Sequence, residues 1–331
     1  MMKTHLPRTL LMAASMAIAN FSHAQSASSI FPSKTITLVV PYAAGGSSDT
    51  RARQIAAKMA TYLGQSVIVE NKPGAAGNIG TDFIAKAPPD GHVIGIGNLA
   101  PLAVNKAMLP KMPFDPATDI TPVALVEKGP LVLLVSAERS PVKTLADLLA
   151  VGKAKPDALS YASAGSGGAF HLAGELLEDM SGVKMLHVPY KGGGPATTDM
   201  LAGTVSFMFD MVPAALPYLK PTPPKARALA VATAQRLPQL PDVPTFAELG
   251  YKNFEVSNWF GVIAPKGTPA PVVAKLNEVV NRALKEPDIV ERITGQGNMI
   301  GGGSAAEFAA FISAETARWA KIIKDKNIQA N

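Results

Sequence analysis

Residues 35–49 read TITLVVPYAAGGSSD, a β-branched apolar run that leads into a glycine-containing loop and then a polar cluster. The apolar run predicts a buried strand over residues 35–40, and the proline and glycines that follow predict a loop. Apolar residues then recur at four-residue spacing from Ile55 to Leu63, which predicts an amphipathic helix capped by one of the polar residues 47–49. The stretch is therefore a strand, a loop and a helix in succession.

The same succession recurs along the chain and predicts an α/β protein. Further strands are predicted over residues 66–69, 92–97, 131–135, 159–162, 185–188, 205–209, 228–232 and 256–263. Two closing helices are predicted over residues 271–284 and 305–323. Alternating strands and helices favour a parallel sheet. A chain of 331 residues is long for one domain, so we expect two α/β units, the second beginning near residue 131.

The N-terminus resembles an export signal. Lys3 and Arg8 precede an apolar run over residues 9–21, and small residues up to Ala24 occupy the offsets typical of a cleavage site. We expect residues 1–24 to be removed after Ala24 and the mature protein to be periplasmic. No other segment of the sequence approaches the roughly 20 apolar residues that span a bilayer. The chain has no cysteine, so packing rather than disulfides must stabilise it.

Composition and motifs argue against nucleic-acid binding and catalysis. The net charge of +6 falls to +4 without Lys3 and Arg8, and the basic residues are scattered rather than interleaved with aromatics. Ser166 lacks a nucleophile elbow because Ala164 stands where that motif has glycine, and no P-loop or HExxH motif occurs. GIGNLA at residues 95–100 lies within a predicted strand, whereas a dinucleotide fingerprint follows its strand. We expect no catalytic residue, metal or cofactor.

Three glycine-rich turns suit anions. They occupy residues 41–46, 163–168 and 189–195, each between a strand and a helix, where N–H groups are unpaired and the helix dipole favours negative charge. The alternative is that these glycines only permit the positive φ angles of tight turns. His171 also has two interpretations: it contacts a ligand, or it packs on its helix and orders the preceding loop. Asp49 is more typical of a helix cap than of a group that faces an anion.

Several motifs together resemble one known family. They are FPSK at 31–34, ITLVVPYAAGGSSD at 36–49, VENKPGAAG at 69–77, YASAGSG at 161–167 with His171 and Leu172, VPYKG at 188–192, PDVPT at 241–245 and WFG at 259–261. These motifs resemble the substrate-binding proteins of tripartite tricarboxylate transporters, the TctC-like family also called Bug receptors, over essentially the whole mature chain. Ser47 and Ser48 replace the more usual Pro-Thr-like pair, which changes the detailed hydrogen bonding of that loop.

The resemblance implies a type II periplasmic-binding-protein fold, with two α/β domains around a central ligand cleft. By analogy, domain 1 is discontinuous and comprises residues 25–128 and 232–331, whereas domain 2 comprises residues 129–231. The chain would cross between the domains near residues 127–131 and 228–233.

The resemblance also implies a function and a site. The protein is expected to be a monomeric periplasmic receptor that captures a small carboxylate (a di- or tricarboxylate, an acidic amino acid or an aromatic acid). It would deliver this solute to the membrane permease of a tripartite tricarboxylate transporter. The alternative is an exported hydrolase or isomerase that uses Ser166 and His171 in the same cleft. The expected ligand-binding residues are Tyr42, Ala43, Ala44, Gly45, Gly46, Ser47, Ser48, Asp49, Asn78, Ser163, Gly165, Ser166, Gly167, His171, Tyr190 and Asp210.

Overall fold

The structure is a computed structural model that describes residues 31–109, 111–155, 158–190, 192–326 and 328. The expected signal peptide, residues 1–24, lies outside these described residues. The strands are β1 (Ile36–Val40), β2 (Val67–Asn71), β3 (Val93–Asn98), β4 (Ile120–Ser136), β5 (Ser160–Ser163), β6 (Leu186–Pro189), β7 (Phe207–Met211), β8 (Ala226–Val231), β9 (Ser257–Pro265) and β10 (Met299–Gly302). The helical elements are α1 (Ser47–Leu63), η1 (Ala75–Gly77), α2 (Asn78–Ala85), η2 (Ala100–Val104), α3 (Asn105–Met108), α4 (Leu145–Ala154), α5 (Ala169–Ser181), α6 (Gly193–Ala202), α7 (Val212–Leu219), α8 (Ala270–Ala283), α9 (Pro287–Thr294) and α10 (Ala305–Lys326).

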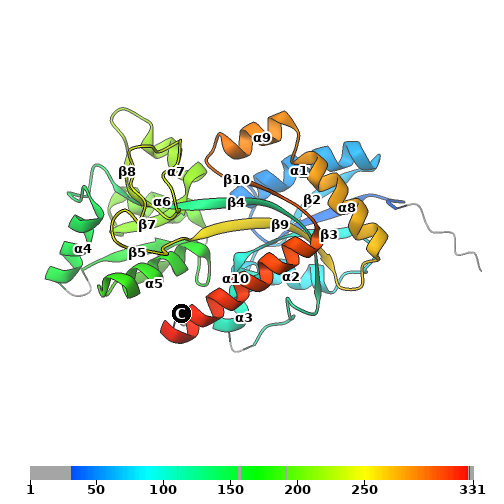
Figure 1. Ribbon diagram of the computed structural model, residues 1–331, viewed down its shortest axis with the longest axis horizontal. Coiled ribbons are helices and arrows are strands. Elements are labelled where there is room, and N and C mark those ends of the chain that lie inside the picture. The colour runs from blue at the N-terminus through cyan, green and yellow to red at the C-terminus, as the bar shows by residue number, and fades with distance from the viewer. Residues whose placement is uncertain (1–30, 110, 156–157, 191, 327, 329–331) are drawn as a thin grey trace, which may run out of the picture.

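The strands form one continuous sheet with two lobes (Figure 1). The first lobe contains β2, β1, β3, β9 and the first part of β4 in that order, with β10 also paired to β4. The second lobe contains the remainder of β4, then β7, β5 and β6, with β8 also paired to β4. β1 is parallel to β2 and β3, and β5 is parallel to β6 and β7. The predicted α/β class with parallel strands is confirmed.

β4 and β9 connect the two lobes. β4 is 17 residues long and changes partners along its length, with Pro130 opposite Ser257 of β9 and Leu131 opposite Met211 of β7. The predicted start of this strand at residue 131 is therefore wrong. Proline normally interrupts a central strand because it lacks an N–H donor. Here the register between β4 and β9 shifts after Pro122, and this irregularity accommodates the proline.

The parallel strands of both lobes point their carboxyl ends toward the junction between the lobes. β3 is antiparallel to β9, and Asn98 at its carboxyl end pairs with Phe260. β7 is antiparallel to β4, and Met211 at its carboxyl end pairs with Leu131, where β4 enters the second lobe. Since the parallel neighbours of β3 and β7 share their directions, the loops after these strands face one another across the junction. Ligands of α/β proteins collect at such strand ends.

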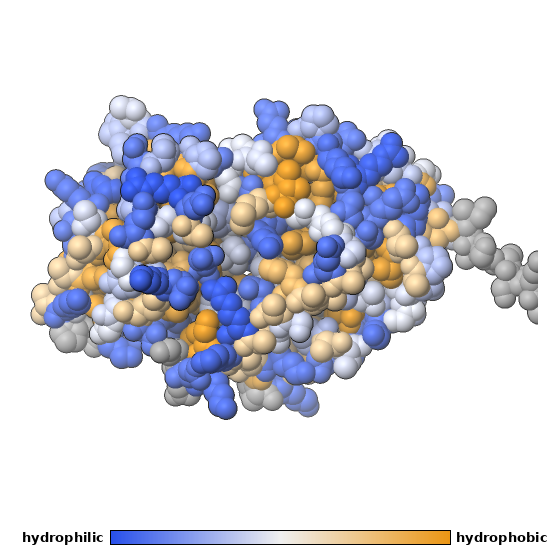
Figure 2. Space-filling model, viewed as in Figure 1, coloured by the Kyte–Doolittle hydropathy of each residue, from blue (hydrophilic) through white to orange (hydrophobic). Residues whose placement is uncertain are grey.

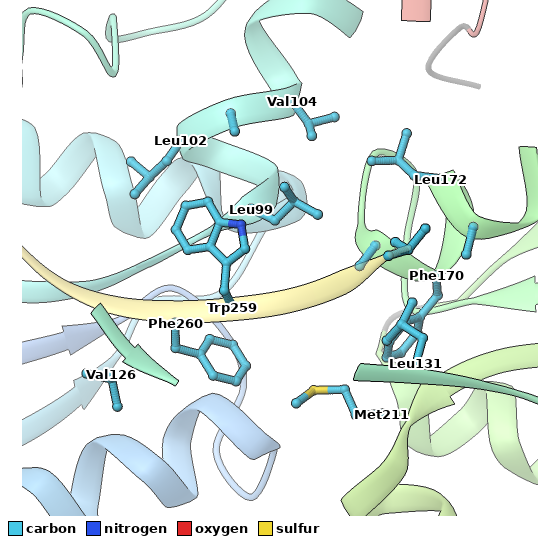
Figure 3. Close-up of a cluster of buried hydrophobic side chains, with 14 of the residues drawn as sticks. Leu99, Leu102, Val104, Val126, Leu131, Phe170, Leu172, Met211, Trp259 and Phe260 are labelled. Carbon is cyan, nitrogen blue, oxygen red and sulfur yellow. The ribbon is translucent and has the colours of Figure 1, made fainter. Parts of the chain in front are cut away.

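Trp259 and Phe260 anchor β9 in the core near the junction. Their side chains point to opposite faces of the strand, as Figure 3 shows, and Trp259 lies toward Leu99 and Leu102. Trp259 is fully buried, and its Nε1 donates a hydrogen bond of 3.2 Å to Oε2 of Glu315. These contacts hold β9 beside β3 and the segment that follows it.

Two local expectations need correction. α1 begins at Ser47, but its N-cap is Gly46, which forms no side-chain cap, so the expected cap from residues 47–49 is wrong. α9 is absent from the sequence prediction because its eight residues carry a single buried apolar pair, Ile289 and Ile293. So short a pattern does not establish helical periodicity.

The face shown in Figure 2 is mainly hydrophilic on both lobes, and its apolar residues gather in separate patches. Within the described residues, no helix combines the length and the apolar character needed to cross a bilayer.

Candidate functional site

The loop between β1 and α1 presents free backbone at the junction. Residues 43–47 are exposed, and Gly45 adopts a φ of +84°, which favours glycine. The first intrahelical bond of α1 runs from the N–H of Thr50 to the carbonyl of Gly46. The N–H groups of the preceding turn therefore have no intrahelical partner, and they carry the positive end of the helix dipole.

Asp49 shapes this loop from behind. Its buried carboxylate accepts hydrogen bonds from the N–H of Gly45 at 2.9 Å, from Nε of Arg53 at 3.1 Å and from Nδ2 of Asn71 at 3.0 Å. Burial opposes ionisation, but the hydrogen bonds from Arg53, Gly45 and Asn71 outweigh it and keep the pKa of Asp49 below its usual value. Asn71 also donates to the carbonyl of Tyr42. Asp49 thus holds the loop, and its oxygens are engaged by the protein.

Tyr42 and Asn98 brace the start of α2. The hydroxyl of Tyr42 donates to Oδ1 of Asn98 at 2.7 Å, and burial raises the pKa of Tyr42 well above its usual range. Gly77 has a φ of +92°, and a Cβ at this position would lie 2.8 Å from the Tyr42 hydroxyl oxygen. The buried side chain of Asn78 follows directly, at the first position of α2.

In the second lobe, two histidines hold the loop of residues 163–168. Oγ of the buried Ser163 lies 2.6 Å from Nε2 of His187 and accepts from the N–H of Gly165 at 3.2 Å. The N–H of Gly167 donates to Nδ1 of His171 at 3.1 Å, and Nε2 of His171 lies 3.4 Å from Glu175 Oε1. Both ring nitrogens of His171 are therefore engaged by protein groups. This arrangement matches the loop-ordering interpretation of His171.

The two histidines share one ring stack, in which His171 is buried and His187 is partly exposed. Their ring centroids lie 4.0 Å apart, and Tyr161 stacks on His187 at 5.0 Å. The Tyr161 hydroxyl donates to Glu175 at 2.6 Å. Burial lowers the pKa of His187 to about 3, with a further lowering by His171 and an opposing effect of Glu175. The His187 ring is therefore neutral at physiological pH.

Tyr190 directly follows β6, and Asp210 is the second-last residue of β7. The Tyr190 hydroxyl donates to Asp199 at 2.6 Å, and burial together with this contact raises the pKa of Tyr190 to about 12. Asp210 is 4% exposed and accepts from the N–H of Met211 at 2.8 Å and from Thr197 Oγ1 at 3.4 Å. Burial raises its pKa to about 7.

The loops of the two lobes meet. A Cβ added to Gly167 in the second lobe would lie 2.9 Å from Oδ1 of Asn105 and 3.6 Å from the sulfur of Met108, both in the first lobe. The structure thus brings the predicted loop of residues 163–168 against the first lobe, beside the predicted Asn78, which bonds to Asn105. A separate groove of about 480 Å³ lies between α7 and the segment Gly295–Gln296, and it contains none of the predicted site residues.

Sequence reasoning missed four polar side chains around this site: Asn98, Asn105, Glu127 and His187. Asn98 is the last residue of a strand that is parallel to β1. A polar residue at such a strand end is a candidate for a ligand site, so its position alone could have identified it. Asn105 follows the buried π-helical segment η2 and carries no motif. Glu127 lies in the part of β4 that the sequence prediction omitted.

Several helices open toward the junction without a side-chain cap, among them α1, α5 and α6. α1, α5 and α6 have the glycine N-caps Gly46, Gly168 and Gly192, and no side-chain cap is seen there among the described residues. One of these helices is in the first lobe and two are in the second. Such N-termini stabilise anions. The site therefore offers donors for negative groups from two opposite sides.

Comparison with known proteins identifies the family. A sequence profile of the tripartite tricarboxylate transporter family receptor matches residues 51–328. The chain belongs to this receptor family. A protein from the tcbD-tcbE intergenic region of Pseudomonas sp. (strain P51) is 43% identical over 302 residues, which cover 91% of this chain and 89% of that protein.

Several solved structures are similar to this chain in sequence and share its fold. R. palustris Rpa4515 with adipate is 38% identical with a TM-score of 0.85, and the match covers 90% of this chain and 99% of that one. MatC from Rhodopseudomonas palustris with bound malate is 38% identical with a TM-score of 0.82, covering 88% and 100%. The periplasmic binding protein BugD is 35% identical with a TM-score of 0.83, covering 90% and 99%. The predicted family and the periplasmic-binding-protein fold are confirmed.

Proposed function

We propose that this chain is a receptor that holds a small dicarboxylate between its lobes and delivers it to the permease of a tripartite tricarboxylate transporter. The observation that carries the proposal is the set of glycine-capped N-termini of α1, α5 and α6, which open on the junction from both lobes. A solute with a carboxylate at each end would interact with both lobes at once and so favour the closed form. Two similar receptors, whose structures contain adipate and malate, support this solute class.

The predicted site residues divide into two roles. Direct contact with the solute is assigned to residues 42–48 and Asn78 of the first lobe. In the second lobe it is assigned to Gly165, Ser166, Gly167, Tyr190 and Asp210. Asp49, Ser163 and His171 hold the loops in place and do not contact the solute, because their polar atoms form hydrogen bonds with the loops themselves. Helix N-termini and neutral donors rather than cationic side chains would hold the solute.

The cellular setting follows from the family. Family members include periplasmic binding proteins, and the proposed export after Ala24 would bring this chain to the same compartment. We propose that residues 25–128 with 232–331 and residues 129–231 move as the two domains of a monomer. The partner would be a membrane permease that accepts the closed, loaded receptor.

A hydrolase or isomerase that uses Ser166 and His171 finds no support in this geometry. A general base needs a ring nitrogen that can take the nucleophile's proton. Nδ1 of His171 accepts from Gly167, and Nε2 faces Glu175. The family profile, moreover, is that of a receptor.

Calorimetric titration with malate and adipate tests the proposal, with Gly46→Val as the decisive variant. Gly46 has an ordinary φ of −76°, and its Cβ would lie 3.7 Å from the nearest atom, so valine fits the fold. Valine would nevertheless occupy the space in front of the α1 N-terminus. We expect at least tenfold weaker binding, about 1.4 kcal/mol.

Thr50→Val, on an exposed position of the same helix, is the matched control and should bind like the unaltered protein. The mono-amides of the two acids should bind poorly, because an amide removes one negative end. Equal affinity for acid and amide, or unchanged binding in Gly46→Val, would contradict the proposed site. Consumption of the acid during incubation would instead favour an enzyme.

A further inference from the structure

Asn105 lies where the two lobes touch. It is the first residue of α3, directly after the π-helical segment η2, and 2% of its surface is exposed. Its Nδ2 donates a hydrogen bond of 2.8 Å to Oδ1 of Asn78, which is 4% exposed. A buried amide-to-amide bond of this kind fixes the orientation of both side chains.

This bond decides which end of the Asn78 amide remains free. The carbonyl oxygen of Asn78 is engaged by Asn105, so its Nδ2 is left as the available group. Among the described residues, Nδ2 of Asn78 makes no hydrogen bond. An amide nitrogen can only donate, and a carboxylate can only accept. The orientation of Asn78 therefore favours a hydrogen-bond acceptor, such as a carboxylate oxygen, over a donor.

The other end of the Asn105 amide faces the second lobe. Its Oδ1 lies 2.9 Å from the position that a Cβ on Gly167 would occupy, and Gly167 has a φ of +78°. Glycine at position 167 thus permits both the turn and the close approach of the second-lobe loop. Asn105 contacts a proposed solute-binding residue on one side and the closing loop on the other.

We propose that Asn105 is a positioning residue. It fixes which end of the Asn78 amide is free to bond the solute, and it contacts the second-lobe loop at Gly167 when the lobes are together. It does not touch the solute. By donating to Asn78, it keeps the Asn78 N–H groups directed at a carboxylate. This inference rests on the proposed function, because it concerns how the same site recognises an anion.

Asn105→Asp is the sharpest test. An ionised aspartate accepts but cannot donate, so it would turn the Asn78 amide and direct its carbonyl oxygen at the solute. We expect at least 100-fold weaker binding of malate and adipate at pH 8. Burial raises the pKa of such a carboxyl group, and the protonated form can again donate to Asn78. Measured against the unaltered protein at the same pH, affinity should therefore recover at least tenfold between pH 8 and pH 6; this comparison removes the change that Asp210, which ionises near pH 7, causes in both proteins.

Two further variants separate positioning from folding. Asn253→Asp adds the same charge at an exposed position with a φ of 64°, and its affinity should equal that of the unaltered protein at each of the two pH values. Asn105→Ala removes the donor without imposing a flip, so we expect about tenfold weaker binding with no recovery at pH 6. If Asn105→Asp does not fold, Asn105→Ala with unchanged affinity overturns the inference by itself.

The outcomes also distinguish the inference from the function on which it rests. An unaltered protein that binds neither acid overturns both. An unaltered protein that binds, together with an Asn105→Asp variant that binds equally well or shows no pH recovery, overturns the role of Asn105 alone.

Discussion

The carboxyl group of Asp210 is buried at the end of β7 with few donors around it. It accepts one short hydrogen bond, from the N–H of Met211, and a longer one from Thr197. This is too little to offset burial, and the pKa rises from 3.8 to about 7. Near neutral pH the group is therefore partly protonated, and in that form it can donate a hydrogen bond to a solute.

Asp210→Asn should change how stability depends on pH. In the unfolded chain the aspartate ionises near pH 3.8, whereas in the fold it ionises near pH 7. Stability that is present below pH 3.8 is therefore progressively lost as the pH rises to about 7. Asparagine keeps the acceptor for Met211 and removes this loss. We expect equal stability of variant and parent near pH 4 and a gain for the variant of up to about 4 kcal/mol at pH 8.

Urea unfolding of the ligand-free proteins at both pH values measures this effect. A stability difference that is the same at pH 4 and pH 8 would show that Asp210 ionises normally in the fold.

The exposed backbone of residues 43–47 could be predicted, because a glycine-rich loop after a buried strand carries a local signal. The contacts that orient the loops could not. Glu127 and its partner Asn298 are 171 residues apart, and Asn105 meets Gly167 only after both lobes have folded. Asp49 was recognised as a helix-terminal residue, but its actual partner, the N–H of Gly45, depends on the detailed turn.

At the scale of elements, α1 is tied to β4 by a buried ion pair. Nη2 of Arg51 lies 3.0 Å from Oε2 of Glu127, and the side chains are 6% and 1% exposed. Asn298, just before β10, donates to the same oxygen at 2.9 Å. The helix whose N-terminus faces the junction is therefore fixed to the strand that crosses it.

Glu127→Ala should destabilise the protein strongly, because it leaves the buried guanidinium of Arg51 without its counter-charge. Loss of one partner of a buried pair typically costs about 3–5 kcal/mol. The double variant Arg51→Met with Glu127→Leu should cost less, since no charge remains buried. Denaturant unfolding of the three variants, including Arg51→Met alone, measures this. A double variant that is less stable than Glu127→Ala would refute the account.

Strand and helix positions in the early part of each lobe were predictable from periodicity, and the errors lie where tertiary pairing overrides local signals. β4 continues through Pro122 and Pro130 because β9 lies alongside it and the register shifts locally. α9 is stabilised by the burial of Ile289 and Ile293 in the core. Neither cause is visible in a short window of sequence.

At the scale of the whole molecule, the shared strands predict that the lobes unfold together. Malate at about 100 times its dissociation constant should add about 2.7 kcal/mol of stability. For a chain of this size that corresponds to a rise of about 4 °C in the midpoint of one transition. Differential scanning calorimetry measures this, with malamide as the uncharged control. Two transitions, of which only one responds to malate, would show that the lobes are independent.

The pairing of β4 with β9 across the junction also limits the mechanics of opening. Two strands bonded to each other resist stretching and sliding, because either motion breaks several hydrogen bonds at once. Twisting and bending of the ribbon break none, and the register shifts in β4 already add local twist. This pairing would restrict the proposed opening to a rotation with few degrees of freedom. A permease that meets this receptor has to distinguish a small set of reproducible shapes rather than a continuum of lobe arrangements.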